Sequence, residues 1–463
     1  MRYNYRRNKA MKIRKLQLKN IGVFDDETIK FQPCPAKDKA EIHIFTGQNG
    51  TGKSTILQAL ASIFNPYLTA TKISFIKDVQ VRNINNFSKK FRSFFDKDSI
   101  LAHSFLSISY EDNLINAVNP KTIVYPNTQT KELTVHDEAG SLSSYRHYLS
   151  GYSGEITFAA FAFSGYRQIE SETVQANYLP KDFNPLSQSL DFIKDYRKQS
   201  EITINQLVAN NISNRALSKE DKSFDEAEKY DAVINAIEVF IKDVTDYDVK
   251  FVLKRSPTEL KLKIHGEELD FDVLPDGLRS LISWIADLLG RIDLLKWQDN
   301  LPITEKNLIL LLDEIEVHLH PAWQRKVLPV VQKLFKNSQI FVSTHSPFVV
   351  NSVDAAWVYE LKVENGKARV AEKSLTKTAY SYQTVLREVF DIDERFGEKT
   401  QEKLEDFLKQ SRHIHQSNGN NEINKDEFLS SARYLASQSA ELQSLVFLEL
   451  ARLSKETGEP YEI

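Results

Sequence analysis

The chain has 463 residues, of which 41% are hydrophobic and 27% are charged, and its formal net charge is −3. This length allows two or three domains, and the composition is that of a packed globular protein rather than a disordered one. The near-neutral charge excludes a generally basic surface, so any phosphate binding must come from a local site. A single cysteine, Cys34, and the lack of a signal peptide or a membrane-spanning apolar stretch lead us to expect a cytoplasmic protein with no membrane contact.

The first part of the chain predicts strands that lead into a glycine-rich turn. A basic arm of residues 1–10 is followed by apolar positions over 13–31 that indicate two strands, and residues 42–46 indicate a third. A helix is predicted from Lys53 to Phe64, because Ile56, Leu57 and Leu60 recur at helical spacing.

Later elements predict an α/β head interrupted by insertions. Continuous apolar runs at 308–312 and 339–344 are typical of strands buried in a parallel sheet, and 278–297 predicts a long buried helix. Asn365-Gly366 predicts a hairpin with a type I′ turn. We divide the chain into a first head part (1–64), an inserted basic and aromatic lobe (65–150), a return to the head (151–184), a short helical insertion (185–246), a second head part (247–380) and a helical tail (381–463).

The strongest motif lies between the third strand and the first helix. It reads Gly47-Gln48-Asn49-Gly50-Thr51-Gly52-Lys53-Ser54 and matches the phosphate-binding loop in the required strand–loop–helix context. Glycines let backbone N–H groups converge on a phosphate, while the lysine reaches the β and γ oxygens and the serine holds Mg²⁺. We therefore expect ATP and Mg²⁺ here, bound by Gly47, Asn49, Gly50, Thr51, Gly52, Lys53, Ser54 and Thr55.

A second motif follows the apolar run 308–312. Asp313 and Glu314 come directly after it, as in a Walker B strand, so Asp313 is expected to hold Mg²⁺ and Glu314 to polarise the attacking water. The long separation between Lys53 and Asp313 favours an ABC/SMC-type head with insertions over a compact module. His345, just past the next buried strand, is expected to hydrogen-bond the γ-phosphate as a switch histidine.

Two runs together resemble the OLD-like and RecF-like group of ABC ATPases, an AAA-type ATPase class. They are Asp313-Glu314-Ile315-Glu316-Val317-His318-Leu319-His320-Pro321 and Ser343-Thr344-His345-Ser346-Pro347. The resemblance implies an ABC-type head in which the segment after the Walker B strand faces a partner protomer. His318 and His320 are therefore expected to be packing or interface residues rather than metal ligands.

The same resemblance implies a signature turn and a Q-loop. Leu274-Pro275-Asp276-Gly277-Leu278-Arg279-Ser280 occupies the place of the signature, so Asp276 and Gly277 are expected to meet ATP held by the opposite protomer. Pro275 stands where these relatives usually carry a serine, and hydrolysis across a dimer is expected to be slow or differently arranged. Gln168 lies where the Q-loop residue should be, and Arg167 is an equally good candidate for a phosphate contact.

Over residues 11–400 the chain is similar to the ATPase subunits of Septu anti-phage systems (PtuA). That similarity rests on the two runs, the short insertions and a tail containing Leu386-Arg387-Glu388-Val389-Phe390. It implies an ATPase that assembles as a head-to-head dimer or higher homo-oligomer. It also implies contact with DNA and a separate HNH nuclease subunit (PtuB-like), so that this chain is not itself a nuclease.

Two alternatives stay open. An OLD-type enzyme would carry its own Toprim nuclease, and Asp391-Ile392-Asp393 has the required spelling but follows a helical rather than a strand pattern. A RecF- or SMC-like DNA-repair ATPase would act without any nuclease.

Two surfaces are candidates for partners. Basic and aromatic residues alternate in the lobe and could bind nucleic acid, or could simply be a solvated face: Lys72, Phe75, Lys77, Arg82, Phe87, Lys89, Lys90, Phe91, Arg92, Phe94 and Phe95. An apolar stripe in the tail, widened by Phe447 and Leu448, predicts a docking face for the nuclease or for another copy of the chain: Leu442, Leu445, Val446, Leu450 and Leu453.

Overall fold

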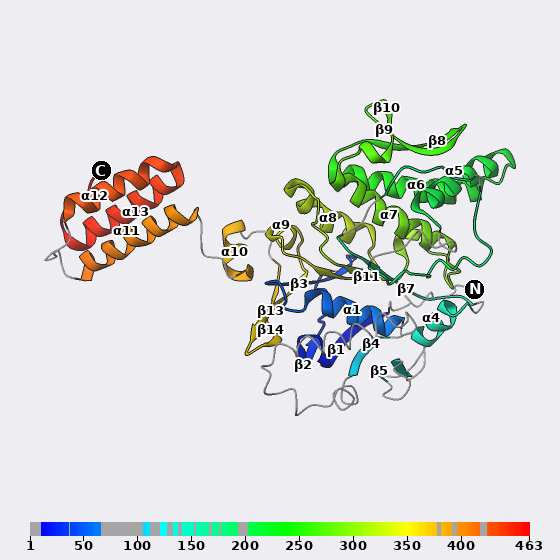
Figure 1. Cartoon of the computed structure of the whole chain (residues 1–463), viewed down its shortest axis with the longest axis horizontal. Coiled ribbons are helices and arrows are strands. Elements are labelled where there is room, and N and C mark those ends of the chain that lie inside the picture. Colours follow the sequence, from blue (N-terminus) through cyan, green and yellow to red (C-terminus); the bar gives the residue numbers. More distant parts are fainter. Residues whose placement is uncertain are drawn as a thin grey trace, which may run out of the picture. The chain divides into compact units, whose positions relative to one another are not determined.

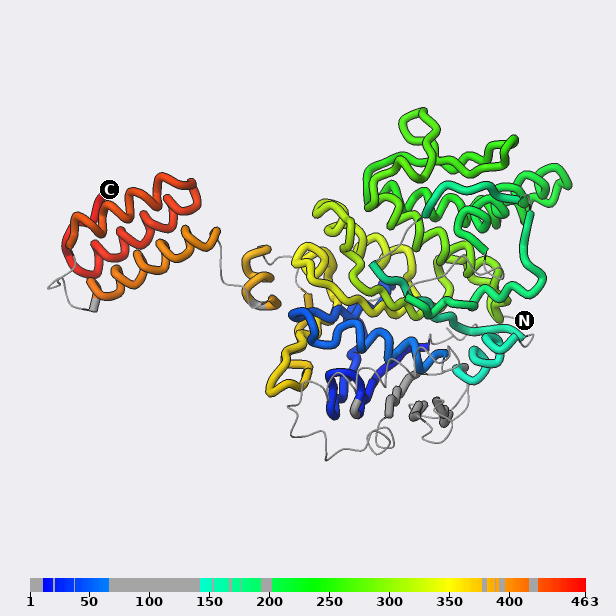
Figure 2. The backbone as a smooth tube through the Cα atoms, viewed as in Figure 1, coloured from blue at the N-terminus to red at the C-terminus, as the bar shows by residue number. Residues whose placement is uncertain are grey.

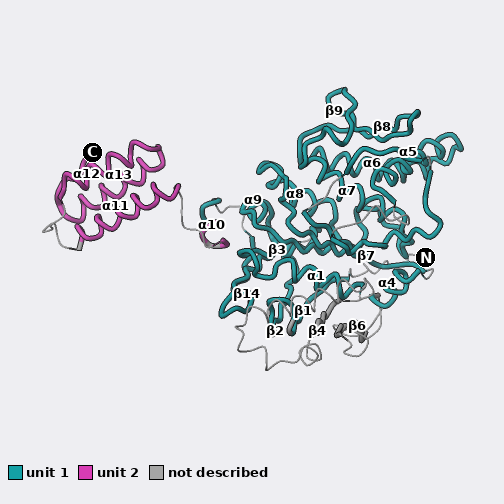
Figure 3. The backbone as a smooth tube through the Cα atoms, in the orientation of Figure 1, with its two compact units in different colours: residues 1–385 teal, residues 386–463 magenta. Residues whose placement is uncertain are grey.

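The computed structural model describes the following ranges: 11–36, 38–65, 105–111, 121–126, 133–137, 141–151, 154–165, 169–175, 177–192, 202–376, 381–390, 396–416 and 424–463. Within them the chain divides into two compact units, residues 1–385 and residues 386–463, which Figure 3 colours separately. The first unit is an α/β structure and the second is helical, so the predicted α/β class with a helical C-terminal part is confirmed.

The centre of the first unit is a sheet with the strand order β14-β13-β3-β12-β11-β7. The five strands from β13 to β7 run parallel, and β14 pairs antiparallel with β13 at one edge. Strands β7, β11 and β12 are buried at every position. The sequences of β7 and β11 are apolar throughout, as expected of strands covered on both faces, while β12 has polar residues only at its two ends, Gln339 and Ser343. The strands are β3 (Glu41–Gly47), β7 (Ala159–Phe163), β11 (Leu308–Leu312), β12 (Gln339–Ser343), β13 (Trp357–Glu364) and β14 (Lys367–Leu375).

A second, antiparallel sheet has the order β2-β1-β4-β5-β6. Its strands are β1 (Lys12–Ile21), β2 (Phe24–Lys30), β4 (Phe105–Glu111), β5 (Lys121–Pro126) and β6 (Leu133–Asp137). Within residues 65–150, the predicted inserted lobe, the three described strands extend the sheet that starts the chain, because β4 pairs with β1 along most of its length.

Helix α1 lies between the two sheets, and a second group of helices covers the far side of the parallel sheet (Figure 1). The helices α5, α6 and α7 pack on one another, as the green segments of Figure 2 show, and β8, β9 and β10 form a small antiparallel sheet beside α6. The bounds of these helices are α1 (Lys53–Phe64), α4 (Ser141–Leu149), α5 (Ile204–Glu220), α6 (Phe224–Thr245), α7 (Asp276–Leu294), α8 (Pro321–Leu334), α9 (Pro347–Val350) and α10 (Tyr382–Phe390). The small sheet comprises β8 (Val249–Arg255), β9 (Thr258–Ile264) and β10 (Glu267–Leu269), and short 3-10 turns occur at Phe271–Val273 and Ile303–Glu305.

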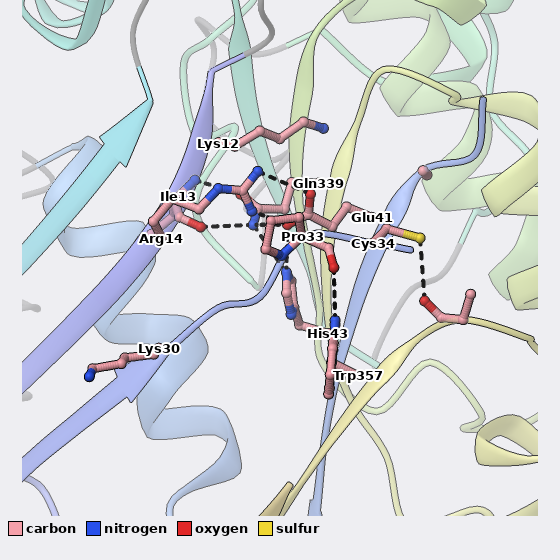
Figure 4. Close-up of polar contacts among 12 residues, drawn as sticks. Lys12, Ile13, Arg14, Lys30, Pro33, Cys34, Glu41, His43, Gln339 and Trp357 are labelled. Carbon is pink, nitrogen blue, oxygen red and sulfur yellow. Dashed lines mark hydrogen bonds and ion pairs between the residues drawn. The ribbon is translucent and has the colours of Figure 1, made fainter. Parts of the chain in front are cut away.

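A buried polar network joins the two main sheets (Figure 4). Gln339, at the start of β12, accepts a hydrogen bond from the Ile13 N–H at 2.7 Å and donates to the Ile13 carbonyl at 3.0 Å and to Glu41 Oε1 at 3.1 Å. Glu41 also pairs with Arg14 of β1 and with Nε2 of His43, which lies 3.1 Å away. The network therefore ties β1 to the beginnings of β3 and β12.

The second unit is a bundle of three helices with its own apolar core. Its helices are α11 (Glu398–Gln416), α12 (Lys425–Gln438) and α13 (Ala440–Thr457). Leu442, Val446, Leu450 and Leu453 of the predicted stripe are buried in this core. Phe447 and Leu448 remain outside it and are 46% and 72% exposed. Among the described residues, no helix is long and apolar enough to cross a membrane.

Candidate functional site

The glycine-rich loop turns from β3 into α1 through three glycines with positive φ. They are Gly47 (141°), Gly50 (83°) and Gly52 (97°), and each conformation is one that residues with a Cβ rarely adopt. A Cβ on Gly47 would lie 2.3 Å from the Leu361 carbonyl oxygen, and one on Gly52 would lie 2.7 Å from the Phe24 ring. Gly47 and Gly52 are therefore required both by the backbone turn and by close packing on β13 and β2, whereas Gly50 is required by the turn alone, because a Cβ there would meet nothing within 4 Å.

Lys53 and Thr51 hold the loop from within. The Lys53 ammonium donates to the carbonyls of Gly47 at 2.8 Å and Gln48 at 2.9 Å, and the Thr51 hydroxyl donates to the same Gln48 carbonyl at 2.9 Å. Asn49 is exposed at the crest of the loop, and Thr55 is half-buried in the first turn of α1.

Strand order brings the second and third motifs to this loop. Because β12 lies between β3 and β11 and all three run parallel, their carboxyl ends meet at one edge of the sheet. There Ser54 Oγ donates to Asp313 Oδ1 at 3.0 Å, and Ser343 Oγ donates to the same oxygen. The backbone N–H of Glu314 donates to Ser343 Oγ at 3.0 Å. The structure thus brings Ser54, Asp313 and the backbone of Glu314 together.

Burial at this edge of the sheet lowers the pKa of both basic groups, Lys53 and His345. Burial lowers the pKa of Lys53, and the carboxylates of Asp313, Glu314 and Glu316 oppose this lowering. Burial, and then the neighbouring Lys53 ammonium, lower the pKa of His345. A neutral His345 imidazole beside a cationic lysine can both donate and accept a hydrogen bond, which suits contact with a phosphate oxygen.

The residues present fit a magnesium ion and a nucleotide phosphate. A serine hydroxyl and a carboxylate are the hard oxygen ligands that Mg²⁺ takes beside substrate phosphates, and Ser54 and Asp313 already lie within hydrogen-bonding distance. The positive-φ glycines leave the loop's N–H groups beside the N-terminus of α1, an arrangement that binds anions. In the part of the chain that the structure describes, no cluster of three or more His, Cys, Asp or Glu side chains could hold a metal by itself.

The signature turn opens α7, with Pro275 at the N-cap and Asp276 in the first turn. Asp276 pairs with Arg279. Gly277 packs tightly against the segment after β11, because a Cβ there would lie 2.6 Å from the His318 carbonyl oxygen. Any side chain at this position would therefore displace that segment, whatever its charge.

Several residues singled out in the sequence lie outside the described ranges or away from the nucleotide loop. Gln168 and Arg167 lie outside the described residues, as do Asp391, Asp393 and the basic and aromatic residues between Lys72 and Phe95. His320 caps α8, because its Nδ1 accepts from the Ala322 N–H at 3.2 Å, while His318 is exposed.

Two residues at the site were not assigned a role from the sequence. Ser343 bridges Asp313 and Glu314, and Glu316 accepts a hydrogen bond from the His345 backbone N–H at 2.6 Å. Both belong to the two sequence runs that resemble the OLD-like and RecF-like ATPases. Their contacts, however, depend on strand order, which the motif sequences do not reveal.

The model of the AAA ATPase domain family matches residues 11–350. The chain belongs to this family. It is similar to the Septu protein PtuA of Bacillus thuringiensis, with 23% identity over 409 residues that cover 86% of this chain and 88% of that protein. It is also 34% identical over 152 residues to the retron Ec83 probable ATPase of Escherichia coli, a match that spans 33% of this chain and only 27% of that relative.

Among solved structures, the SMC head bound to the C-terminal winged-helix domain of ScpA aligns with a TM-score of 0.45 and 14% identity. The alignment covers 79% of this chain and 98% of that one. The family assignment therefore rests on the domain match, and the resemblance to PtuA extends over most of the AAA ATPase chain.

Proposed function

We propose that this AAA ATPase binds Mg²⁺-ATP, hydrolyses it to ADP and phosphate, and serves as the ATPase subunit of an anti-phage defence complex. The observation that carries the ATPase proposal is the convergence of Ser54, Asp313 and Ser343 beside the loop of Lys53. The similarity to the Septu protein PtuA over 86% of the chain supports the defence role.

Each residue has a proposed task. The loop N–H groups and Lys53 bind the β- and γ-phosphates, and Ser54 and Asp313 hold Mg²⁺, which when bound neutralises charge that develops on the transferred phosphoryl group. Glu314 orients the attacking water and accepts its proton, and His345 contacts the γ-phosphate. Gln168 is proposed as a further contact from the Q-loop.

Two substitutions test this assignment. Lys53→Ala should abolish ATP binding, measured by isothermal titration, because the phosphates lose their cation. Glu314→Gln should keep binding but lower turnover at least tenfold, since the amide cannot accept the water's proton. The exposed Lys336 and Glu364 provide matched controls, and Lys336→Ala and Glu364→Gln should leave both properties unchanged. Unchanged turnover in Glu314→Gln would remove Glu314 from this role.

We also propose that ATP is held between two protomers, by the Lys53 loop of one and the signature turn of the other. Asp276 lies exposed in the first turn of α7, and the N-terminus of a helix favours an anion. Light scattering of the Glu314→Gln variant with saturating ATP should give a dimer or a higher even-numbered assembly. A strictly monomeric protein under these conditions would contradict the model.

The partner of the complex is proposed to be a separate HNH nuclease, docked on the helical unit 386–463. The exposed Phe447 and Leu448 of α13, with Tyr434 of α12, leave apolar surface outside the bundle core. Phe447→Ser with Leu448→Ser should abolish co-purification with the genomic neighbour, whereas Val363→Ser, at an equally exposed position on β13, should not. Retention of the neighbour by the double variant would move the docking site elsewhere.

The alternatives have distinct outcomes. If the isolated chain cuts DNA with Mg²⁺ and loses that activity on Asp391→Ala and Asp393→Ala, the chain carries its own nuclease. If it binds DNA and turns over ATP without any nuclease partner, a RecF-like repair role replaces the defence role.

A further inference from the structure

The segment between β11 and α8 has an unusual backbone. Glu314 and His318 adopt positive φ angles of 50° and 64°, although neither is glycine. Residues with a Cβ hold such conformations only where surrounding contacts impose them. Residues 314–319, which we call the linking segment, are therefore held in place by their neighbours.

Two glycines let other parts of the site press against the linking segment. A Cβ on Gly277 of α7 would lie 2.6 Å from the His318 carbonyl oxygen, and a Cβ on Gly165, just after β7, would lie 2.9 Å from the Val317 side chain and 3.1 Å from the Glu314 carbonyl oxygen. The segment is thus packed between the signature turn and the end of β7, so it cannot shift without moving one of them.

Two hydrogen-bonded links connect the same segment to the end of β12. The Glu316 carboxylate accepts from the His345 backbone N–H at 2.6 Å. Gln324 of α8 donates to the Leu319 carbonyl at 2.8 Å and accepts from Ser346 Oγ at 2.6 Å. The linking segment is therefore connected to both His345 and Ser346, so a movement of the segment should move both residues.

The backbone N–H of His345 is the first one beyond the ladder of β12. The preceding N–H, of Thr344, still donates to the Phe45 carbonyl of β3 at 3.1 Å. At His345 the chain leaves the sheet, and the partner of its N–H is a side-chain carboxylate instead of a strand. Burial raises the pKa of the Glu316 carboxyl, and the hydrogen bond from the His345 N–H opposes that rise. Because this bond is only 2.6 Å long, it can fix a chain end that no strand holds.

We propose that Glu316 is a positioning residue for the ATPase reaction: its side chain fixes the main chain of His345, and with it the imidazole, relative to the Lys53 loop. In this proposal Glu316 acts through His345 and not on the nucleotide. The inference rests on the proposed contact between His345 and the γ-phosphate, and it explains why a carboxylate stands two residues after Glu314. It also gives the signature turn a route to His345, from Gly277 through the linking segment to Glu316.

The test compares four proteins with the full-length wild type: Glu316→Ala, Glu316→Gln, His345→Ala and the double variant Glu316→Ala with His345→Ala. Glutamine keeps an acceptor oxygen for the His345 N–H, whereas alanine removes it. Thermal unfolding of each variant first checks that the fold is intact.

The first measurement needs no turnover. Amide hydrogen exchange of a peptide covering residues 344–350, followed by mass spectrometry, should be at least tenfold faster in Glu316→Ala and close to wild type in Glu316→Gln. Equal protection in Glu316→Ala and wild type would overturn the proposal. This readout decides the inference even if the wild-type chain proves not to hydrolyse ATP, an outcome that would defeat the proposed function alone.

The second measurement is steady-state ATP hydrolysis. A misplaced catalytic group commonly costs about 10- to 100-fold, so Glu316→Ala should lower kcat by that factor with KM changed less than about threefold. Glu316→Gln should recover most of kcat. In the His345→Ala background, Glu316→Ala should cause no further loss, because its effect passes through His345. Additive losses, or a Glu316→Gln variant as slow as Glu316→Ala, would show that Glu316 acts directly, and the proposal would be wrong.

Discussion

The network at the base of the parallel sheet offers a prediction whose size can be worked from the structure. Gln339 is fully buried and makes three hydrogen bonds with Ile13 and Glu41: one from the Ile13 N–H at 2.7 Å, one to the Ile13 carbonyl at 3.0 Å and one to Glu41 Oε1 at 3.1 Å. Its Nε2 also lies 3.1 Å from His43 Nε2. Gln339→Leu has a similar volume but removes all three. The substitution should therefore leave the buried N–H and carbonyl of Ile13, on β1, without partners.

The expected loss follows from those groups. A buried donor or acceptor left unpaired costs about 1–3 kcal/mol. Here the Ile13 N–H and carbonyl both lose their partner, while Glu41 retains Arg14 and His43. Allowing for the gain from burying a leucine, the free energy of unfolding should fall by about 3 kcal/mol.

Gln332 provides the matched control. It is also buried, but its side chain makes only long hydrogen bonds, to the carbonyls of Ala40 at 3.3 Å and Asp354 at 3.4 Å. Gln332→Leu should cost about 1 kcal/mol or less. Urea unfolding followed by tryptophan fluorescence measures both, because all four tryptophans lie in the unit 1–385. If Gln339→Leu costs no more than Gln332→Leu, the network does not stabilise the fold as argued.

Three further predictions concern pH, the signature turn and the helical unit. Burial lowers the pKa of His43 from its ordinary value of 6.5, so His43 binds a proton more readily in the unfolded chain than in the folded one. Stability should therefore fall as the pH decreases below about 6.5. Burial would raise the pKa of Glu41, but hydrogen bonds from His43 and Arg14 outweigh burial and lower that pKa to about 2. A second loss of stability should therefore follow as the pH falls from 4.5 to 2. Urea midpoints measured between pH 7 and 3 check both losses, and midpoints that do not change with pH would contradict them. Pro275→Ser should raise ATP turnover, because it restores the serine that the resembling ATPases usually carry in the signature. It should also stabilise the protein by about 1 kcal/mol, because Pro275 is the N-cap of α7 and provides no side-chain cap. Pro302→Ser, at a similarly uncapped 3-10 turn, should leave turnover unchanged. The fragment 396–463 should fold by itself and unfold cooperatively by circular dichroism, since its three helices share one apolar core, and a non-cooperative helix signal would show that it needs the rest of the chain.

The local features of this protein follow from its sequence because they depend on neighbouring residues. The glycine spacing of the loop, the helix that begins at Lys53 and the apolar runs of β11 and β12 need only short-range geometry. The same holds for the hairpin at Asn365-Gly366, where both residues have the positive φ angles, 52° and 77°, of a type I′ turn. The motifs and their order were enough to identify an AAA ATPase, as the family match confirms.

Only the tertiary structure decided which distant residues become neighbours. The sequence order of the strands does not reveal that β12 runs between β3 and β11, and this arrangement alone puts Ser343 beside Asp313 and the His345 N–H beside Glu316. Likewise, nothing near Gln339 in the chain predicts its bonds to Ile13 and Glu41, which lie about 300 residues away. Strand neighbours are chosen by the collective burial of whole apolar faces rather than by any local pattern, so contacts of this kind appear only once the sheet is assembled.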